Sequence, residues 1–296
     1  MRVFYFTGTG NSLQVARAIG EGGELVSIPL FLREHQIEIG VAIKELASSM
    51  APADAATAIR TNGDTMTGKR IIIKDDAVGL VFPTYYWEVP AIVVEFLEKV
   101  KIESDYFFVL TTRGVASVTL KSNLRQIARR NGHCLSYYSQ ISMPDNFLPL
   151  CNMTNQKKRF TASVLAQSIG LRVTDVRARK SNVRGPTAPG FLVSAGSSII
   201  RAFTGGTKPA SESFLVDANC TGCGICAKAC SAQSIKIVED MPVFSSTCND
   251  CLACVHLCTT GALHMRKEKT SERYLNPTIK KDDIIEAHSP QRLPVR

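Results

Sequence analysis

The sequence predicts an α/β protein with a doubly wound parallel sheet, followed by a helical linker and a small α+β domain rich in cysteine. Three observations lead to this prediction. Strand-like and helix-like segments alternate over residues 1–150, the pattern weakens over 151–210, and eight of the ten cysteines fall within 220–258. Alternating strands and helices favour a parallel sheet covered by helices on both faces. A length of 296 residues suits about two domains.

The elements of the first part can be placed from their apolar patterns. Continuous apolar runs at 2–6, 77–82 and 106–111 are typical of parallel strands that are covered on both faces. Shorter strands are expected at 24–28 and 134–140, and helices at 11–20, 90–100 and 116–130. Residues 29–74 are long for a single crossover, so we expect an inserted helix near 41–49.

The segment after residue 150 is predicted to be helical and then polar. One amphipathic helix is expected over 157–180 and a second over 191–203, with a break at 181–190 where Gly and Pro occur. We therefore expect four parts: a sheet domain at 1–150, a basic helical linker at 151–210, a cysteine-rich domain at 211–267, and a poorly ordered polar tail at 268–296.

The net charge of +9 is concentrated in the linker, where 10 basic side chains face a single acidic one, Asp175. Such a segment could bind nucleic acid or an anionic membrane surface, dock an acidic partner, or cover anionic cofactors. We favour the last two and expect no nucleic-acid partner. The sequence has no apolar run of about 18 residues and no recognisable signal peptide, so we expect a cytoplasmic protein with reduced thiols and no transmembrane segment.

The cysteines form two copies of the motif C-x2-C-x2-C-x3-C, 28 residues apart. Three cysteines at every third residue wrap round one face of an iron–sulfur cubane, and the fourth points to the other cluster. We therefore expect two [4Fe–4S] clusters with crossed ligands. Cluster one takes Cys220, Cys223, Cys226 and Cys258, and cluster two takes Cys248, Cys251, Cys254 and Cys230. Zinc sites or disulfides are the weaker alternatives, since zinc ribbons pair separated C-x2-C hairpins and disulfides need an oxidising compartment.

This block resembles the bacterial two-cluster ferredoxin domain over residues 212–267. That family usually has Pro after the fourth cysteine, where this chain has Ser231 and Thr259. A hydroxyl or a freed backbone N–H at these positions could donate toward a cluster and raise its potential. His256 lies inside the second motif but is not needed as a ligand, and Cys134 and Cys151 are expected to be plain thiols.

A loop rich in Thr and Gly follows the first predicted strand and has the sequence Thr7-Gly8-Thr9-Gly10-Asn11-Ser12. Its glycines let the backbone close round an anion, and the helix N-terminus behind it adds a favourable dipole. The loop has no Lys or Arg, which argues against a triphosphate site, and Leu13 breaks the fingerprint G-x-G-x-x-G. A neutral cradle for one terminal phosphate remains, although a simple capped helix start would look similar.

Two more loops follow predicted strands, at the carboxyl ends where ligands of open α/β sheets bind. The first holds Thr84, Tyr85, Tyr86 and Trp87, the only Trp of the chain. An aromatic cluster on a loop suits stacking on a flat ring. The second holds Thr111, Thr112, Arg113 and Gly114, which would supply backbone groups to the edge of that ring.

Together the three loops resemble the flavodoxin family over residues 1–148. The resemblance implies FMN, with its phosphate on the loop 7–12 and its isoalloxazine between the loops 84–87 and 111–114. A flavodoxin-like fold that has lost its flavin is the alternative.

The order of the parts resembles the flavodoxin–ferredoxin fusion proteins of anaerobes. This resemblance implies a cytosolic electron carrier that moves single electrons between FMN and two [4Fe–4S] clusters, and on to a redox partner protein that is acidic and ferredoxin-like, or a reductase. The alternative is an FMN-dependent oxidoreductase, such as a quinone reductase, fed by its own clusters. For that alternative the sequence offers only Tyr85, Tyr86 and Arg113 as candidate proton donors.

Overall fold

The computed structural model describes residues 1–36, 70–114, 120–183 and 210–289. Its centre is a five-stranded sheet in the order β2-β1-β4-β6-β7, whose strands are Glu24–Ser27, Arg2–Tyr5, Ala77–Pro83, Tyr106–Arg113 and Leu135–Ser142. All four neighbouring pairs are parallel. Counted along the chain the order is 2-1-3-4-5, which is that of flavodoxin-like doubly wound sheets. The predicted α/β parallel sheet is therefore confirmed.

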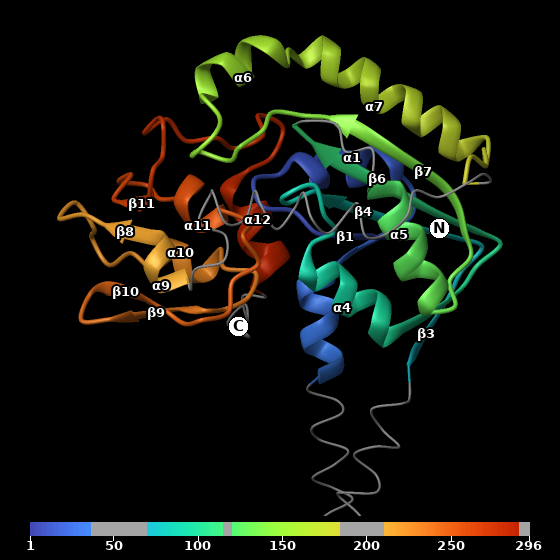
Figure 1. The fold of residues 1–296 in the computed structure, drawn as a ribbon, viewed down its shortest axis with the longest axis horizontal. Helices are drawn as coiled ribbons and strands as arrows, with labels where there is room; N and C mark the ends of the chain where they lie inside the picture. The colour runs from blue at the N-terminus through green and yellow to red at the C-terminus, as the bar shows by residue number, and fades with distance from the viewer. Residues whose placement is uncertain (37–69, 115–119, 184–209, 290–296) are drawn as a thin grey trace, which may run out of the picture.

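Helices cover both faces of this sheet (Figure 1). Helices α1 (Asn11–Ile19) and α7 (Ala162–Arg177) lie on one face, and α4 (Ala91–Lys99) and α5 (Leu120–Arg130) lie on the other. Residues 28–36 are also helical. This arrangement explains the continuous apolar runs of the central strands, because neither face of the sheet meets water.

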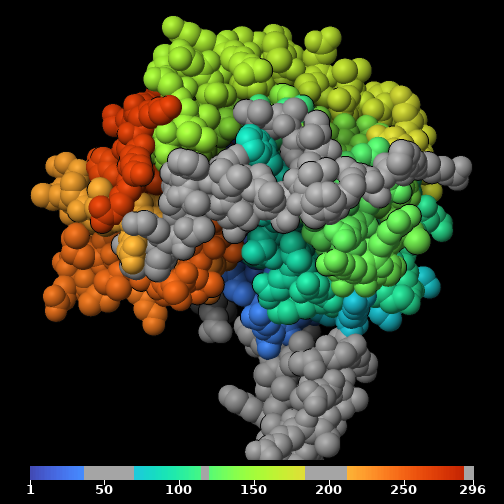
Figure 2. Space-filling view, viewed as in Figure 1, coloured from blue at the N-terminus to red at the C-terminus, as the bar shows by residue number. Residues whose placement is uncertain are grey.

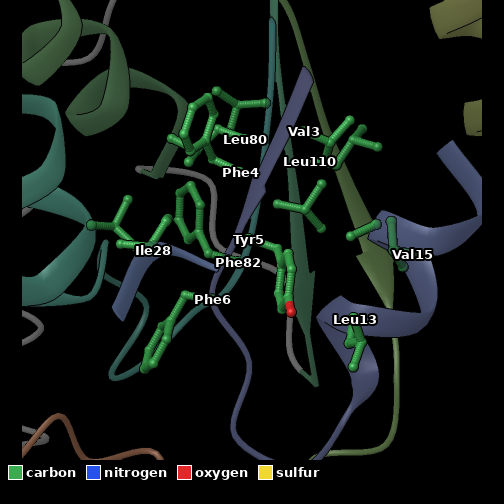
Figure 3. Packing of buried hydrophobic residues seen from close by; sticks show 14 of the residues in the cluster. Val3, Phe4, Tyr5, Phe6, Leu13, Val15, Ile28, Leu80, Phe82 and Leu110 are labelled. Carbon is green, nitrogen blue, oxygen red and sulfur yellow. The ribbon is translucent and has the colours of Figure 1, made fainter. Parts of the chain in front are cut away.

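The core follows the two-residue period of the strands. Figure 3 shows Val3 and Tyr5 directed toward α1, whereas Phe4 and Phe6 point to the opposite face. All four side chains are buried, together with Val15 from α1. The first strand thus anchors both layers and fixes the position of the loop that follows it.

The linker differs from the prediction of one helix at 157–180. Two helices are present, α6 (Met153–Arg159) and α7, because the chain breaks at Phe160 and Thr161. Asn152 caps α6 by accepting a hydrogen bond from the N–H of Asn155 at 3.3 Å. The helices expected at 41–49 and 191–203 lie outside the described residues.

Two short strands of the sheet domain were not predicted from the sequence. Strands β3 (Ile71–Lys74) and β5 (Val100–Glu103) pair in parallel as a separate two-stranded sheet. The second of them begins where helix α4 ends, so the expected helix at 90–100 stops one residue early.

The cysteine-rich part contains two strand–helix–strand units, β8-α10-β9 and β10-α11-β11. Strand β9 pairs antiparallel with β10, and β8 pairs antiparallel with β11. Each unit places one cysteine motif on a loop and a one-turn helix. The elements are α9 (Ala210–Ser213), β8 (Phe214–Val216), α10 (Ile225–Lys228), β9 (Ile235–Val238), β10 (Met241–Phe244), α11 (Ala253–His256) and β11 (Leu263–Met265).

The expectation of a poorly ordered tail is wrong for residues 268–289. This stretch ends in helix α12 (Lys281–His288), and it buries Tyr274, Asn276, Ile284 and His288. Its apolar side chains are widely spaced among polar ones, so the stretch looks hydrophilic in sequence although it packs along the molecule.

The expected domain limits do not separate independent cores. The apolar cluster around the sheet also contains Leu257 and Ile285, and the cluster of the cysteine-rich part contains Leu148 and Met153. The two parts consequently lie in close contact, as the space-filling view shows for the orange and red C-terminal residues (Figure 2). No helix within the described residues is long and apolar enough to span a membrane.

Candidate functional site

A cavity of about 400 Å³ opens at the carboxyl ends of β1, β4 and β6, next to the point where the strand order reverses. Twelve of the fourteen residues predicted to bind a flavin line this cavity. The exceptions are Gly10 and Thr111. Thr111 is fully buried, and its hydroxyl lies 3.3 Å from that of Tyr138. The volume falls in the range of about 300–1,000 Å³ typical of small-molecule sites.

The loop 7–12 presents buried hydroxyls beside the start of α1. The side chains of Thr7, Thr9 and Ser12 are almost fully buried. Thr7 Oγ1 accepts the N–H of Gly10 at 3.1 Å, and Ser12 Oγ lies 2.8 Å from Thr112 Oγ1 on the next loop. Helix α1 has no side-chain hydrogen bond at its N-cap. The first turn of α1 therefore directs backbone N–H groups toward the loop, as an anion site requires.

The aromatic loop is a tight two-residue turn closed by backbone hydrogen bonds between Tyr85 and Glu88. Tyr86 and Trp87 occupy its centre with φ values of 51° and 63°. Positive φ at both central residues is the geometry of a tight two-residue turn, and Glu239 and Asp240 adopt it too between β9 and β10. Trp87 is 40% exposed at the cavity mouth. Tyr85 instead packs edge-on against Phe6, with ring centroids 6.1 Å apart.

The third loop brings a cation with an unused donor to the cavity. Arg113 lines the cavity, and burial lowers the pKa of its guanidinium. Its Nε atom is buried and has no hydrogen-bond partner among the described residues. A buried donor without a partner is costly, so this atom is suited to an acceptor on a bound ligand.

A fourth segment, missed from the sequence, completes the wall. Residues 143–147 follow β7 and lie against the other loops: the N–H of Met143 donates to Arg113 O, and Asn146 Nδ2 donates to Thr9 Oγ1. The ring of Phe147 lies 5.7 Å from that of Tyr86. This segment has no motif, and its place follows only from the sheet order, which puts β7 beside β6.

The same segment supplies a carboxyl group to the cavity. Burial raises the pKa of Asp145, and a hydrogen bond from the N–H of Phe147 opposes that rise. The side chain lies against Gly114, where an added Cβ would come within 2.3 Å of it. It also interacts with Cys151, whose thiol pKa is raised to about 12 by burial and by the Asp145 charge. Asp145 is thus a titratable group at the cavity that was not predicted from the sequence.

The loop 7–12, which was predicted to hold a phosphate and is called the phosphate loop below, packs directly on the second cysteine motif. A Cβ added to Gly8 would lie 2.2 Å from the carbonyl oxygen of Cys251, so only glycine fits there. Asp250 and Leu252, on either side of Cys251, line the cavity. The candidate ligand site and the second cysteine motif therefore share a wall.

The first predicted cluster site gathers its four cysteines as expected. Cys220, Cys223, Cys226 and Cys258 line one small cavity, together with Gly222 and Gly224. Burial raises the pKa of the Cys226 thiol to about 11, and the neighbouring sulfurs of Cys223, Cys258 and Cys220 add to the rise. The fourth cysteine of the second motif thus lies with the first three of the first motif.

The second site is the more deeply buried of the two. Burial raises the pKa of Cys254, and so do the sulfurs of Cys251, Cys248 and Cys230. Cys251, Cys254 and Cys230 are buried, whereas none of the four cysteines at the first site is buried. The first site is consequently the one nearer to solvent.

Hydroxyls lie beside the sulfurs at the two positions that follow the fourth cysteine of each motif. Ser231 Oγ lies 3.6 Å from Cys251 Sγ, and Thr259 Oγ1 lies 3.9 Å from Cys223 Sγ. Each hydroxyl therefore faces a sulfur of the other motif. Hydrogen bonds to cluster sulfurs are one of the factors that set cluster potentials.

Within the described residues no group of three or more His, Cys, Asp or Glu side chains is arranged to hold a single metal ion. In a [4Fe–4S] cubane each cysteine binds a different iron, so its four ligands surround a cluster rather than one ion. The donor set of eight thiols, and its division into two groups of four, fit two such clusters.

Four of the seven basic linker residues that the structure describes pair with carboxylates of the same chain. Lys157 pairs with Glu272 at 2.6 Å, and Arg177 pairs with Glu21 at 3.1 Å. Arg179 pairs with Asp76, and Lys180 pairs with Asp175. These exposed pairs reduce the positive charge available to an acidic partner or to nucleic acid.

Comparisons of the chain with protein-family models and with curated proteins find no match. Its possible function therefore has to be argued from the site.

Proposed function

We propose that this protein is an electron carrier that moves single electrons between FMN and two [4Fe–4S] clusters and passes them to a redox partner protein. The contact between Gly8 and the Cys251 carbonyl is the main support, because it joins the flavin site to a cluster site without an intervening layer. When bound, FMN accepts two electrons and releases them singly, whereas each cluster carries one.

Different residues of the chain would bind different parts of FMN. The buried hydroxyls of Thr7, Thr9 and Ser12 and the start of α1 suit the phosphate. Trp87 and Tyr86 offer aromatic faces to the isoalloxazine, and Arg113 Nε offers a donor. Thr84, Thr112 and Gly114 complete the lining.

The burial of the two cysteine sites suggests an order of transfer. The second site, held by Cys248, Cys251, Cys254 and Cys230, shares a wall with the flavin cavity. The first site is nearer to solvent. We infer that, if both clusters are bound, the residues of the second site would hold the cluster beside the flavin cavity, and those of the first site would hold the cluster that is accessible to a redox partner. An acidic partner would dock at cluster one only if the linker residues that are not paired with carboxylates carry enough positive charge to attract it.

An FMN-dependent oxidoreductase is the second candidate, and Asp145 is the observation that favours it. A carboxyl group whose pKa is raised by burial keeps its proton to a higher pH than an exposed carboxyl group does, and it could give that proton to an organic acceptor such as a quinone. The mouth of the cavity, at Trp87 and Leu150, is exposed to solvent.

Cofactor analysis of anaerobically prepared protein tests the proposal. We expect about eight iron, eight acid-labile sulfide and one FMN per chain, since eight cysteines and one phosphate loop are present. A redox titration followed by visible absorbance and EPR should then resolve one flavin and two cluster signals. Four iron, or bound zinc, would contradict the ligand assignment, and rapid multiple turnover with a quinone that Asp145→Asn abolishes would favour the oxidoreductase.

A further inference from the structure

The C-terminal segment 274–288 lies behind the phosphate loop and holds it by buried hydrogen bonds. The N–H of Asn276 donates to Thr9 O at 2.9 Å, and its side-chain Nδ2 donates to Asn11 Oδ1 at 3.1 Å and to Gln14 Oε1 at 2.8 Å. Tyr274 donates its hydroxyl proton to the same Asn11 Oδ1 at 2.8 Å. The conformation of the loop is therefore set by residues more than 260 positions later in the chain.

Gly10 shows how closely the segment fits the loop. Gly10 has a φ of 94°, and a Cβ added to it would lie 2.9 Å from Ile279 and 3.0 Å from Asn276. The backbone of the loop is thus turned so that one side faces the cavity and the other packs on the segment.

The same segment also holds the second cysteine motif. The N–H of Tyr274 donates to Nδ1 of His256 at 3.1 Å, and Nε2 of His256 donates to Asn146 O at 2.9 Å. Burial lowers the pKa of His256 to about 4, which keeps its ring neutral, as one donating and one accepting nitrogen require. His256 is therefore a link between the motif and the cavity wall.

His288 joins the two sites most directly. Its ring nitrogens lie 2.8 Å from the carbonyl oxygens of Thr7, in the phosphate loop, and of Ala229, next to Cys230. Carbonyl oxygens only accept, so two hydrogen bonds need both ring protons. Burial lowers the pKa of His288 to about 4, so the neutral ring donates to one of the two carbonyl oxygens at a time.

Helix α12 anchors this end of the segment on the sheet domain. Ser27 donates its hydroxyl proton to Ala287 O, Arg33 donates to His288 O, and Arg17 pairs with Asp283 at 2.6 Å.

We propose that segment 274–288 fastens the flavin site to the second cluster site, with Asn276 and His288 as positioning residues, so that FMN and cluster two bind cooperatively. This proposal rests on the proposed function. Coupling between two sites needs an element in contact with both, and its magnitude is typically about 5- to 150-fold in affinity. The bridge from Thr7 to Ala229 is such an element.

The test is the FMN dissociation constant of the full chain, measured by flavin fluorescence with its clusters intact and after their removal by an iron chelator under argon. We expect about tenfold weaker FMN binding without clusters. In His288→Ala this difference should disappear, and millimolar imidazole should restore it by filling the vacated space. Asn276→Ala should weaken FMN binding in both states.

His133→Ala is the matched control. His133 is equally buried, and its ring nitrogens contact the backbone at Leu97 and Ile102, away from the cofactor loops. The His133→Ala substitution should lower the stability of the fold, but it should leave the tenfold difference in FMN affinity between the protein with and without clusters unchanged. A second readout is the EPR relaxation of the flavin radical, which the neighbouring reduced cluster should accelerate less in His288→Ala.

The outcomes separate the two proposals. A chain that binds neither FMN nor iron refutes the proposed function and this inference with it. A chain that binds both, but whose FMN affinity is the same with and without clusters, refutes only the inference. If His288→Ala does not fold, the inference is still tested by the FMN affinity of the wild type with and without clusters, and by the FMN affinity of Asn276→Ala.

Discussion

Replacing Gly8 by Ala perturbs a close backbone contact between the loop 7–12 and the second cysteine motif. The new methyl group would lie 2.2 Å from the Cys251 carbonyl oxygen and 3.2 Å from both the Cys251 carbonyl carbon and the Tyr85 hydroxyl. Ordinary contacts of a Cβ begin at 3.4 Å. The two backbones would have to separate by about 1 Å, because neither is a flexible side chain that could turn away.

Overpacking of this kind costs about 1–3 kcal/mol. For a chain of this size each kcal/mol lowers the unfolding temperature by about 2–4 °C. We therefore expect Gly8→Ala to unfold about 2–12 °C lower than the wild type in a calorimetric scan, and to bind FMN more weakly.

Gly170→Ala is the control, since Gly170 lies in helix α7 with nothing within 4 Å of an added Cβ. It should stabilise the protein by about 0.5–1 kcal/mol, the usual effect of replacing glycine inside a helix. Equal unfolding temperatures and equal FMN affinities for Gly8→Ala and the wild type would show that the phosphate loop does not pack on the cysteine motif.

Three further predictions concern single side chains. Cys230→Ala should remove the cluster held by residues 248–254 and spare the other, as EPR and iron analysis would show; loss of only the cluster held by 220–226 would refute the crossed ligands. Asp145→Asn should lower the pKa of Cys151, because a neighbouring charge is removed. Peptide-level mass spectrometry should then detect faster alkylation of Cys151 at pH 9. An unchanged alkylation rate would show that Asp145 does not influence the Cys151 thiol. Hydrogen bonds to two carboxylates raise the pKa of His264 above that of the unfolded chain. The protonated His264 therefore stabilises the fold fully below about pH 6.5, and this stabilisation is lost as the pH rises. The unfolding temperature of the wild type should fall between pH 6 and 8, and that of His264→Gln should fall less steeply.

The loops and the cysteine motifs could be predicted because their chemistry is local. Glycines between hydroxyls, an aromatic run after a buried strand, and cysteines at every third residue each specify a site within a dozen residues. The sheet could be predicted because buried parallel strands are continuously apolar. Even so, Gly10 and Thr111 do not line the cavity, since one packs on the C-terminal segment and the other lies in the core.

The rest depends on contacts between distant residues. Asn276 is fully buried, although Asn in a polar stretch normally indicates a loop at the surface. Asp145 lies at the cavity only because β7 is placed beside β6. Widely spaced apolar residues in the supposed tail, such as Tyr274 and Ile279, were the only local sign that this stretch packs against something.

The contact between His288 and Thr7 has a consequence for biosynthesis. The two residues are 281 positions apart, so Thr7 and its loop are synthesised long before His288, which supports them. At a synthesis rate of about 5–20 residues per second, roughly 15–60 s separate the two events. During that time the first strand can join the sheet, but the loop 7–12 is not yet supported by segment 274–288. A chain released before residue 274 is made would lack the hydrogen bonds from Tyr274, Asn276 and His288 that hold the loop 7–12.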